Sequence, residues 1–242
     1  MGTSVRLRYA TVALAVAIIV CAGAVFAAGH TARPAPARAA VAPRLIAATP
    51  TRAVPKPQPA HQVVAPSAPQ AFEIAGPAFR IHADVCPMPF VRPLDPPGDQ
   101  THTVCWVDHD FGVAPGSAAK GTTYVLGHAW AEAPLVLNPL SIFAMNHVNR
   151  AHPTVEAGVR TYPVAALDGY RITLRTGKGV LGYAIRRAFS VAKDQAGDLP
   201  TVMNTHVPGR VVLITCAVHN GVDVDENVIA YAYLISSVAL RA

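Results

Sequence analysis

The chain has 242 residues, of which 52% are hydrophobic and 14% are charged, and its formal net charge is +6 at pH 7. This length suits one ordinary domain with additional segments. Residues 1–72 hold seven of the 20 basic residues and none of the 14 acidic ones. The rest of the chain is therefore nearly neutral, and it has no run of Lys and Arg, which excludes an electrostatic binding face for nucleic acid.

An uncharged apolar run covers residues 9–29 and follows Arg6 and Arg8. It is long enough to cross a bilayer as one helix. Basic residues before such a run favour a cytoplasmic N-terminus, with the following chain outside the cell. We therefore expect residues 1–29 to form a single-pass signal anchor in the cell membrane. A cleaved signal peptide is the alternative, because small residues at 25–28 and 37–40 resemble cleavage sites.

The next segment, residues 30–71, is rich in proline and alanine. It holds nine prolines and has no periodic apolar pattern. Such a composition cannot build a core and favours an extended spacer. We expect a disordered linker over residues 30–71, followed by one extracytoplasmic domain over residues 72–242.

Short apolar runs rich in β-forming residues dominate the expected domain, and loop signals such as Pro-Gly and Asp-Gly separate them. They cover residues 122–126, 170–174, 181–191, 211–215 and 228–235. One helix is predicted over residues 139–148, where apolar residues recur at helical spacing. The pattern predicts a mostly antiparallel β architecture, either a barrel or a sandwich.

Two of these runs end in residues that can perform chemistry. The run 124–126 leads into Gly127 and His128, and the run 211–215 leads into Cys216. A nucleophilic cysteine needs a partner that keeps it as thiolate and later moves a proton, and an imidazole can do both. Taken singly, the cysteine could equally be an inert buried thiol, and the histidine a structural residue.

Both segments together resemble a known family. The string LDPPGDQTHTVCWVDHDFGVAPGSAAKGTTYVLGHAW (94–130) and the string VLITCAVHNGVDVDENVIAYAYL (212–234) are similar to actinobacterial sortases, particularly the class F-like group. Two motifs in the expected order and spacing are a specific signal. The resemblance implies a mostly β fold, a sortase-like eight-stranded antiparallel or mixed barrel with one or two short helices.

The resemblance also implies a function, that of a cysteine transpeptidase. Such an enzyme cleaves a C-terminal LPxTG-like sorting signal on a substrate protein. It holds the acyl half as a thioester, here on Cys216, and passes it to an amine, often that of cell-wall peptidoglycan. His128 would protonate the leaving amine and deprotonate the incoming one. No cofactor is implied.

One family feature is missing from the last strand. Sortases of this group carry an arginine just before the D-N pair, whereas Asp225 occupies the aligned position here. Asn227 is a tentative replacement as an oxyanion or substrate-binding donor, although a turn role is the alternative. Arg186, Arg187 and Arg210 are further candidates, and nothing in the sequence selects one of them.

Two other functions compete with this interpretation. The first is a different cell-envelope cysteine acyl-transferase or hydrolase, such as an L,D-transpeptidase, but the His-Gly-Cys cluster of that class is replaced here by Ile214-Thr215-Cys216. The second is a catalytically weak domain that binds peptides. The absent arginine favours a weak domain, and the retained His128 and Cys216 favour an enzyme.

The remaining cysteines and histidines give fewer signals. Cys86 and Cys105 would be free to form a disulfide in an exported domain, but spacing alone does not establish that they lie close enough. The other histidines do not stand at metal-ligand spacing with cysteines or carboxylates, so we expect no metal site.

Overall fold

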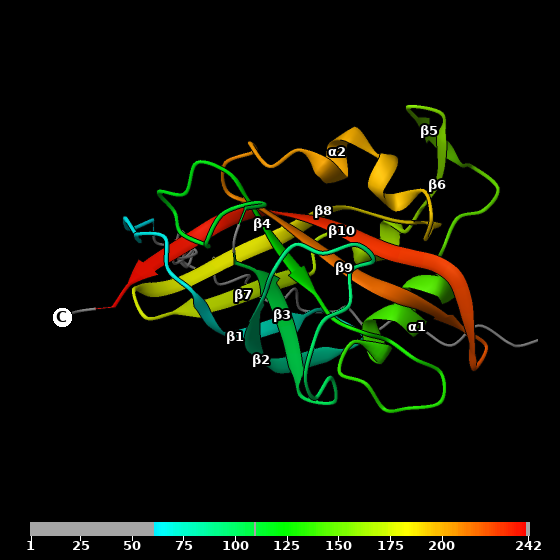
Figure 1. The fold of residues 1–242 in the computed structure, drawn as a ribbon, viewed down its shortest axis with the longest axis horizontal. Helices are drawn as coiled ribbons and strands as arrows, with labels where there is room; N and C mark the ends of the chain where they lie inside the picture. Colours follow the sequence, from blue (N-terminus) through cyan, green and yellow to red (C-terminus); the bar gives the residue numbers. More distant parts are fainter. Residues whose placement is uncertain (1–60, 109, 241–242) are drawn as a thin grey trace, which may run out of the picture. The chain divides into compact units, whose positions relative to one another are not determined.

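The computed structural model describes residues 61–108 and 110–240 of the chain. Ten strands and four short helical segments follow one another in this part (Figure 1). In chain order they are β1 (Pro69–Ala75), β2 (Arg80–Met88), β3 (Thr103–Val107), β4 (Thr122–Leu126), α1 (Asn138–Asn146), β5 (Thr154–Glu156), β6 (Val159–Pro163), η1 (Ala165–Leu167), β7 (Arg171–Thr176), β8 (Gly179–Ala192), η2 (Ala196–Asp198), α2 (Pro200–Met203), β9 (Arg210–His219) and β10 (Val222–Ala239).

Eight of the strands close into a barrel. They are hydrogen-bonded in the order β10-β9-β4-β3-β2-β1-β7-β8, and β8 pairs with β10 to complete the ring. Six of these neighbouring pairs are antiparallel, and β2–β3 and β4–β9 are parallel. The closed, mixed eight-stranded barrel with short helices confirms the fold class that the sequence predicted.

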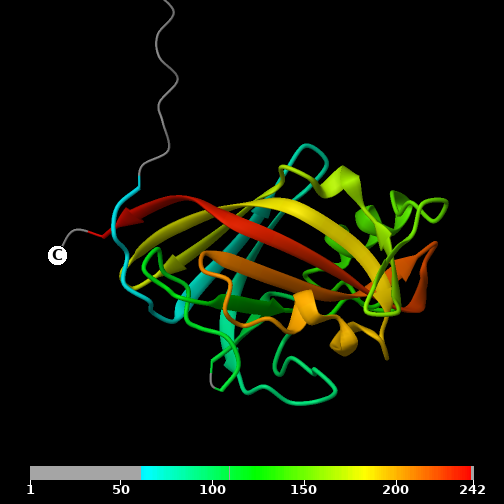
Figure 2. The same cartoon turned by 90° about the horizontal axis from the view of Figure 1, so that it is seen from above.

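The two longest strands, β8 and β10, hold the barrel together. They pair from Gly179 with Ala239 at one end to Ala192 with Glu226 at the other. Figure 2 shows both strands curving along the whole domain. The first half of β8 also pairs with β7, and its second half pairs with β6, which carries β5 at its outer edge. A long strand of this kind can belong to the barrel and also support an extension beyond it.

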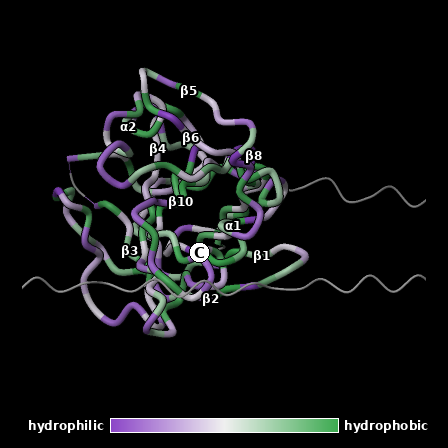
Figure 3. The backbone as a smooth tube through the Cα atoms, turned by 90° about the vertical axis from the view of Figure 1, so that its right-hand side faces the viewer, coloured by the Kyte–Doolittle hydropathy of each residue, from purple (hydrophilic) through white to green (hydrophobic). Residues whose placement is uncertain are grey.

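Side chains alternate between two hydrophobic clusters. In β9, Val211 and Leu213 belong to the cluster inside the barrel, whereas Val212 and Ile214 belong to a second cluster on the outer face. β4 alternates in the same way, with Val125 inside and Tyr124 outside. Figure 3 colours the backbone by hydropathy, and both hydrophobic and hydrophilic stretches occur along it. The sheet between β4 and β10 is therefore buried on both faces, which explains its nearly continuous apolar sequence.

The covers of the two faces differ. Helix α1 is packed mainly against β9, and its buried Leu140, Ala144 and Met145 join the inner cluster. The outer cluster is covered by α2, through Val202, and by the segment around Phe90 and Phe111, whose rings stack 4.0 Å apart. This outer cover leaves a cleft over the ends of β4 and β9.

The ordered chain starts before the expected boundary at Phe72. Val64 is 1% exposed and belongs to the inner cluster, and His61 forms a bridge with Ser237 of β10. The segment ahead of β1 is therefore packed on the barrel, and the predicted linker, residues 30–71, does not extend to residue 71. The predicted membrane span, residues 9–29, lies outside the described residues. Within residues 61–108 and 110–240, no helix is long and apolar enough to cross a membrane.

Cys86 and Cys105 form a disulfide between the parallel strands β2 and β3, where they are register partners. The sequence left this bridge open, because nothing local shows that the strands adjoin. Cys105 is fully buried in the outer cluster. The bridge therefore joins β2 to β3 at a point where both cysteines pack in the outer cluster.

The disulfide makes a measurable contribution to stability. For cysteines with a sequence separation of 19, the chain-entropy model gives a stabilisation of about 3 kcal/mol. Cys86→Ala/Cys105→Ala should lower the free energy of unfolding in urea by about that amount. Thiol counting first verifies that the parent carries the bridge. A free energy of unfolding within about 0.5 kcal/mol of the parent value would then show that the bridge does not stabilise the domain.

Candidate active site

The register of two parallel strands brings His128 beside Cys216. Tyr124 pairs with Val212 and Leu126 pairs with Ile214. Two residues further along each strand, the same register sets His128 opposite Cys216. Both side chains follow the outward-facing members of their strands, so they point to the same face. The two segments that the sequence singled out thus meet at one point, where the outer cover of the barrel ends.

A glycine is required at position 127 for the chain after β4 to stay beside β9. A Cβ atom at this position would lie 2.7 Å from Leu137 Cδ1 and 3.2 Å from Val104 Cγ1, both in the inner core. Its backbone N–H donates to the carbonyl of Ile214 at 3.2 Å, which extends the β4–β9 ladder by one step. The absence of a side chain therefore lets the chain stay against β9 as far as His128.

On its other side, Cys216 lies next to a bulge in β10. Cys216 pairs with Asn227 and Ala217 pairs with Val224, so two residues of β10 have no partner in β9. Bulges often occur beside active sites, where they redirect side chains. Asn227, the tentative donor, is therefore the direct cross-strand neighbour of Cys216 and lines the same cleft.

A buried serine of α1 supplies hydrogen bonds to the backbone around the nucleophile. The hydroxyl of Ser141 donates to the carbonyl of Cys216 at 2.8 Å and accepts from the N–H of Val218 at 2.8 Å. Ser141 is fully buried. The β4 strand has ended at this level, so the serine satisfies backbone groups that would otherwise be buried without partners. Helix α1 thereby holds the part of β9 that presents the thiol.

The electrostatics of the pair favour a thiolate and an imidazolium. Hydrogen bonding to His128 lowers the pKa of Cys216, and the positive charge of Lys193 and the backbone N–H of Ala129 act in the same direction, against the effect of burial. Hydrogen bonding to Cys216 raises the pKa of His128, again against burial. Each group thus stabilises the charged form of the other, as a nucleophilic cysteine requires.

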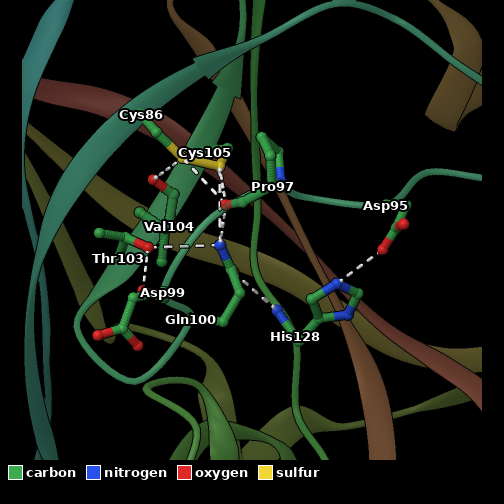
Figure 4. Close-up of a disulfide and its surroundings, with 9 residues drawn as sticks. All are labelled: Cys86, Asp95, Pro97, Asp99, Gln100, Thr103, Val104, Cys105 and His128. Atoms are coloured by element: carbon green, nitrogen blue, oxygen red, sulfur yellow. Dashed lines mark hydrogen bonds and ion pairs between the residues drawn. A yellow bond between two sulfur atoms is a disulfide. The ribbon is translucent and has the colours of Figure 1, made fainter.

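A third residue contacts the imidazole. His128 Nε2 lies 3.0 Å from Asp95 Oδ1, and this contact adds to the rise in the pKa of His128. Figure 4 shows Asp95 facing the ring, while Gln100 approaches the backbone of His128. The Oε1 of Gln100 accepts from the His128 N–H at 3.4 Å, and its Nε2 donates to the Pro97 carbonyl at 2.7 Å. The loop that carries Asp95 is therefore anchored beside the histidine.

A cleft of about 330 Å³ opens beside the pair. We call it the first cleft. Its lining is mostly apolar and includes Phe90, Leu94, Phe111, Tyr124, Leu126, Met203 and Ile214, with Arg92, His128, Lys193, Cys216 and Asn227 among its polar members. A mostly apolar cleft with a few convergent polar groups at one end is typical of a ligand site.

None of the three arginine candidates lines this cleft. Arg210 is 3% exposed at the far end of β9, where its guanidinium bonds Thr122 Oγ1 and the carbonyls of Thr201 and Asn204. Arg187 lies 3.5 Å from Glu156 and over the ring of Phe189. Arg186 interacts electrostatically with Asp168. All three arginines are therefore occupied away from Cys216.

The cation beside the nucleophile is Lys193, which the sequence analysis missed. Val191 of β8 pairs with Asn227, which in turn pairs with Cys216, so these residues form one row across the sheet. Lys193 follows two residues later, and its backbone N–H donates to the carbonyl of Asp225 at 3.3 Å. The pairing of β8 with β10, which no local pattern reveals, is what brings a lysine from the end of the predicted strand 181–191 to the site.

No metal ligand set accompanies these residues. In the described part of the chain, no group of three or more His, Cys, Asp and Glu side chains could hold a metal ion.

Asp95 is the other functional candidate that the sequence did not reveal, although it lies inside the string used for the resemblance. Its contact with His128 depends on how its loop folds over the barrel end.

Comparison with known proteins adds solved structures of similar fold. No family model matches the chain, and no curated protein matches it. Sortase A of Listeria monocytogenes is 15% identical, with 72% of this chain and 92% of that chain covered and a TM-score of 0.43. Sortase E1 of Streptomyces coelicolor, with a tripeptide in its active site, is 11% identical over 71% and 91% of the two chains, with a TM-score of 0.43. Sortase C-1 of Actinomyces oris is 16% identical over 68% and 73%, with a TM-score of 0.41. At these identities the function has to follow from the chemistry of the chain's own site.

Asp95 should tune the protonation of His128. Asp95→Asn removes the carboxylate charge, so the pKa of His128 should fall, and the fall should be small because Asp95 is largely exposed to water. Titration of the His128 ring signals by NMR measures this shift, with Asp84→Asn as an exposed control on β2. A pKa that stays level or rises in Asp95→Asn would show that the contact has no electrostatic role.

Lys193 should tune the thiol. Lys193→Met removes a positive charge that lowers the pKa of Cys216, so that pKa should rise. The rate of iodoacetamide alkylation against pH reports the thiolate fraction without any substrate. Lys178→Met, in the turn between β7 and β8, is the matched control and should leave the profile in place. Equal pH profiles of alkylation for both variants would show that Lys193 does not influence the pKa of Cys216.

Proposed function

We propose that the chain is an extracytoplasmic cysteine transpeptidase of the sortase family. The observation that carries this proposal is the β4–β9 register, which sets His128 beside Cys216 at the end of a mostly apolar cleft. The opposed pKa shifts of the two residues add the charge state that nucleophilic attack requires. Asp95 gives the pair a third member, as in other nucleophile–base–carboxylate sites.

In the first half-reaction, the Cys216 thiolate attacks the carbonyl carbon of the scissile peptide bond. The C–N bond breaks, and the His128 imidazolium gives its proton to the departing amine. The products are a thioester on Cys216, a neutral His128 and a free amine. The developing oxyanion lies close to Lys193, Asn227 and the Ala129 N–H, which are the donors available beside the thiol.

In the second half-reaction, an amine attacks the thioester carbonyl. The C–S bond breaks, a new amide bond forms, and His128 takes a proton from the attacking nitrogen. This step restores the thiolate and imidazolium pair. Water would use the same route and would give hydrolysis in place of transfer.

The substrate, acceptor and location follow the resemblance. The donor is a substrate protein with a C-terminal LPxTG-like sorting signal, and the acceptor is an amine of the cell-wall peptidoglycan. The segment 9–29 anchors the protein in the membrane with the domain outside the cell. The Cys86–Cys105 disulfide supports an oxidising compartment, because such bonds are rare in the cytosol.

The peptide-binding alternative rested on a vacant cation position. Lys193 now supplies a cation beside Cys216, although from β8 and not from β10. The L,D-transpeptidase alternative gains no support, because that class relies on a His-Gly-Cys cluster that the chain lacks. The sortase activity is therefore the function that the site supports best.

The proposal predicts which variants lose peptide cleavage. The full chain is incubated with a library of LPxTG-like peptides, and mass spectrometry follows cleavage and the mass of a thioester on Cys216. Cys216→Ala should abolish both, and His128→Ala should lower cleavage by at least about a hundredfold, because general acid–base catalysis contributes that much. His206→Ala, in the turn before β9, is the histidine control and should keep parental cleavage. Normal cleavage by Cys216→Ala would rule out this mechanism.

A further inference from the structure

A second cleft lies on the other side of the catalytic pair. It is lined by His128, Ala129, Trp130, Leu135, Lys193, Cys216 and Asp223. His128, Lys193 and Cys216 line both clefts, so the two meet at the thiol. Each cleft is lined by Lys193 and one carboxylate, Asp194 in the first and Asp223 in the second, and the second adds the indole ring of Trp130. A transpeptidase must place two substrates on the same carbonyl carbon, and two clefts that meet at the nucleophile suit that requirement.

Trp130 is a rigid element of the second cleft. Its backbone N–H donates to Asn138 Oδ1 at 2.9 Å, and its carbonyl accepts from Asn138 Nδ2 at 2.9 Å. Asn138 is the first residue of α1, so the helix end fixes this position. The Trp130 side chain nevertheless stays exposed, with 46% of the residue open to solvent. An exposed indole on a fixed backbone can receive a cation on its face.

Asp223 is the acidic group of this cleft. It lies at the start of β10, and its Oδ1 accepts from the N–H of Ala131 at 2.9 Å. Its Oδ2 has no hydrogen-bond partner among the described residues, so one carboxylate oxygen remains open to a ligand. The tether to Ala131 places the carboxylate beside the backbone that follows Trp130, and both residues line the second cleft. Lys193, on the side of Cys216, is the only Lys or Arg among the residues that line this cleft.

Resting on the proposed function, we propose that the second cleft is the acceptor site and that it takes a primary amine with a carboxylate on the same carbon, as in a free amino-acid end. The ammonium group lies against Asp223 and the face of Trp130, and the acceptor's carboxylate lies toward Lys193. A cleft with one acidic and one basic side chain matches a ligand that carries one charge of each sign. A peptide amine without that carboxylate satisfies only Asp223.

The proton balance is consistent with this placement. The bound ammonium carries three N–H protons. One passes to solvent before the attack, which leaves the neutral amine as nucleophile. One passes to His128 as the C–N bond forms and the C–S bond to Cys216 breaks, and the third stays on the new amide. His128 lines the second cleft itself, so no rearrangement of the site is needed for this transfer.

The test compares glycine with glycinamide as acceptors for the full chain carrying a sorting-signal acyl group on Cys216. The two amines differ in the carboxylate alone, and each variant is measured with both, so the amines' own basicity cancels in the ratio. Transfer and hydrolysis products are quantified by mass spectrometry as the acceptor concentration is raised. The half-saturating concentration of each amine is the readout.

Asp223→Asn should raise the half-saturating concentration of both amines about threefold to fivefold, which is the range for one exposed charge pair. The asparagine keeps an Oδ1 that can accept from Ala131, so the tether survives while the charge is lost. Trp130→Leu is a second variant and should act in the same direction. Asp225→Asn, a nearby carboxylate outside both clefts, should leave the values unchanged.

Lys193→Met should raise the half-saturating concentration of glycine about threefold more than that of glycinamide. Equal changes for the two amines would overturn the carboxylate contact, and unchanged values in both Asp223→Asn and Trp130→Leu would overturn the acceptor site. A parental chain that forms no thioester with any sorting-signal peptide would overturn the proposed function together with this inference. A thioester whose transfer ignores these variants would overturn the acceptor site alone.

Discussion

The parallel register of β4 and β9 is the constraint on which the rest of the site depends. Because Leu126 pairs with Ile214, the residues two steps further on lie side by side, and these are His128 and Cys216. A parallel pair cannot be closed by a short hairpin, so the register has to be set by the barrel as a whole. A shift by one residue would turn one of the two side chains into the barrel, away from its partner.

The elements around this pair supply the hydrogen bonds and the positive charge that β4 and β9 do not provide. Ser141 of α1 completes the backbone of Cys216, the bulge in β10 brings Asn227 beside it, and the end of β8 brings Lys193. Each comes from a different part of the chain. The site is thus a junction of four strands, one helix and one loop, and its charges are set by neighbours that share no local sequence motif.

Two clefts meet at this junction, and they share His128, Lys193 and Cys216. On one side, the rings and aliphatic chains of the first cleft suit an extended apolar peptide, whose acyl group would reach Cys216. On the other, Trp130, Lys193 and Asp223 offer polar contacts. In both half-reactions the amine nitrogen lies on the same side of the acyl carbon, so His128 gives a proton to the departing amine and later takes one from the arriving amine at the same place.

The sequence by itself determined the strongest strands, with β4 at its observed bounds of 122–126, the helix near 139–148, and the two chemical residues. Those elements are apolar and regular enough for local patterns to reveal them. The sequence placed Cys216 at the end of a strand, whereas β9 continues through Cys216 to His219. It did not reveal β1, β2, β3, β5 or β6. Polar residues and Pro87 interrupt β2, and β5 has only three residues. Only the tertiary structure decided the Cys86–Cys105 bridge, the contact of Asp95 with His128, and the choice of Lys193 over the three arginines. Each of these depends on which strands become neighbours, and closure of the barrel sets that through contacts between residues far apart in the chain.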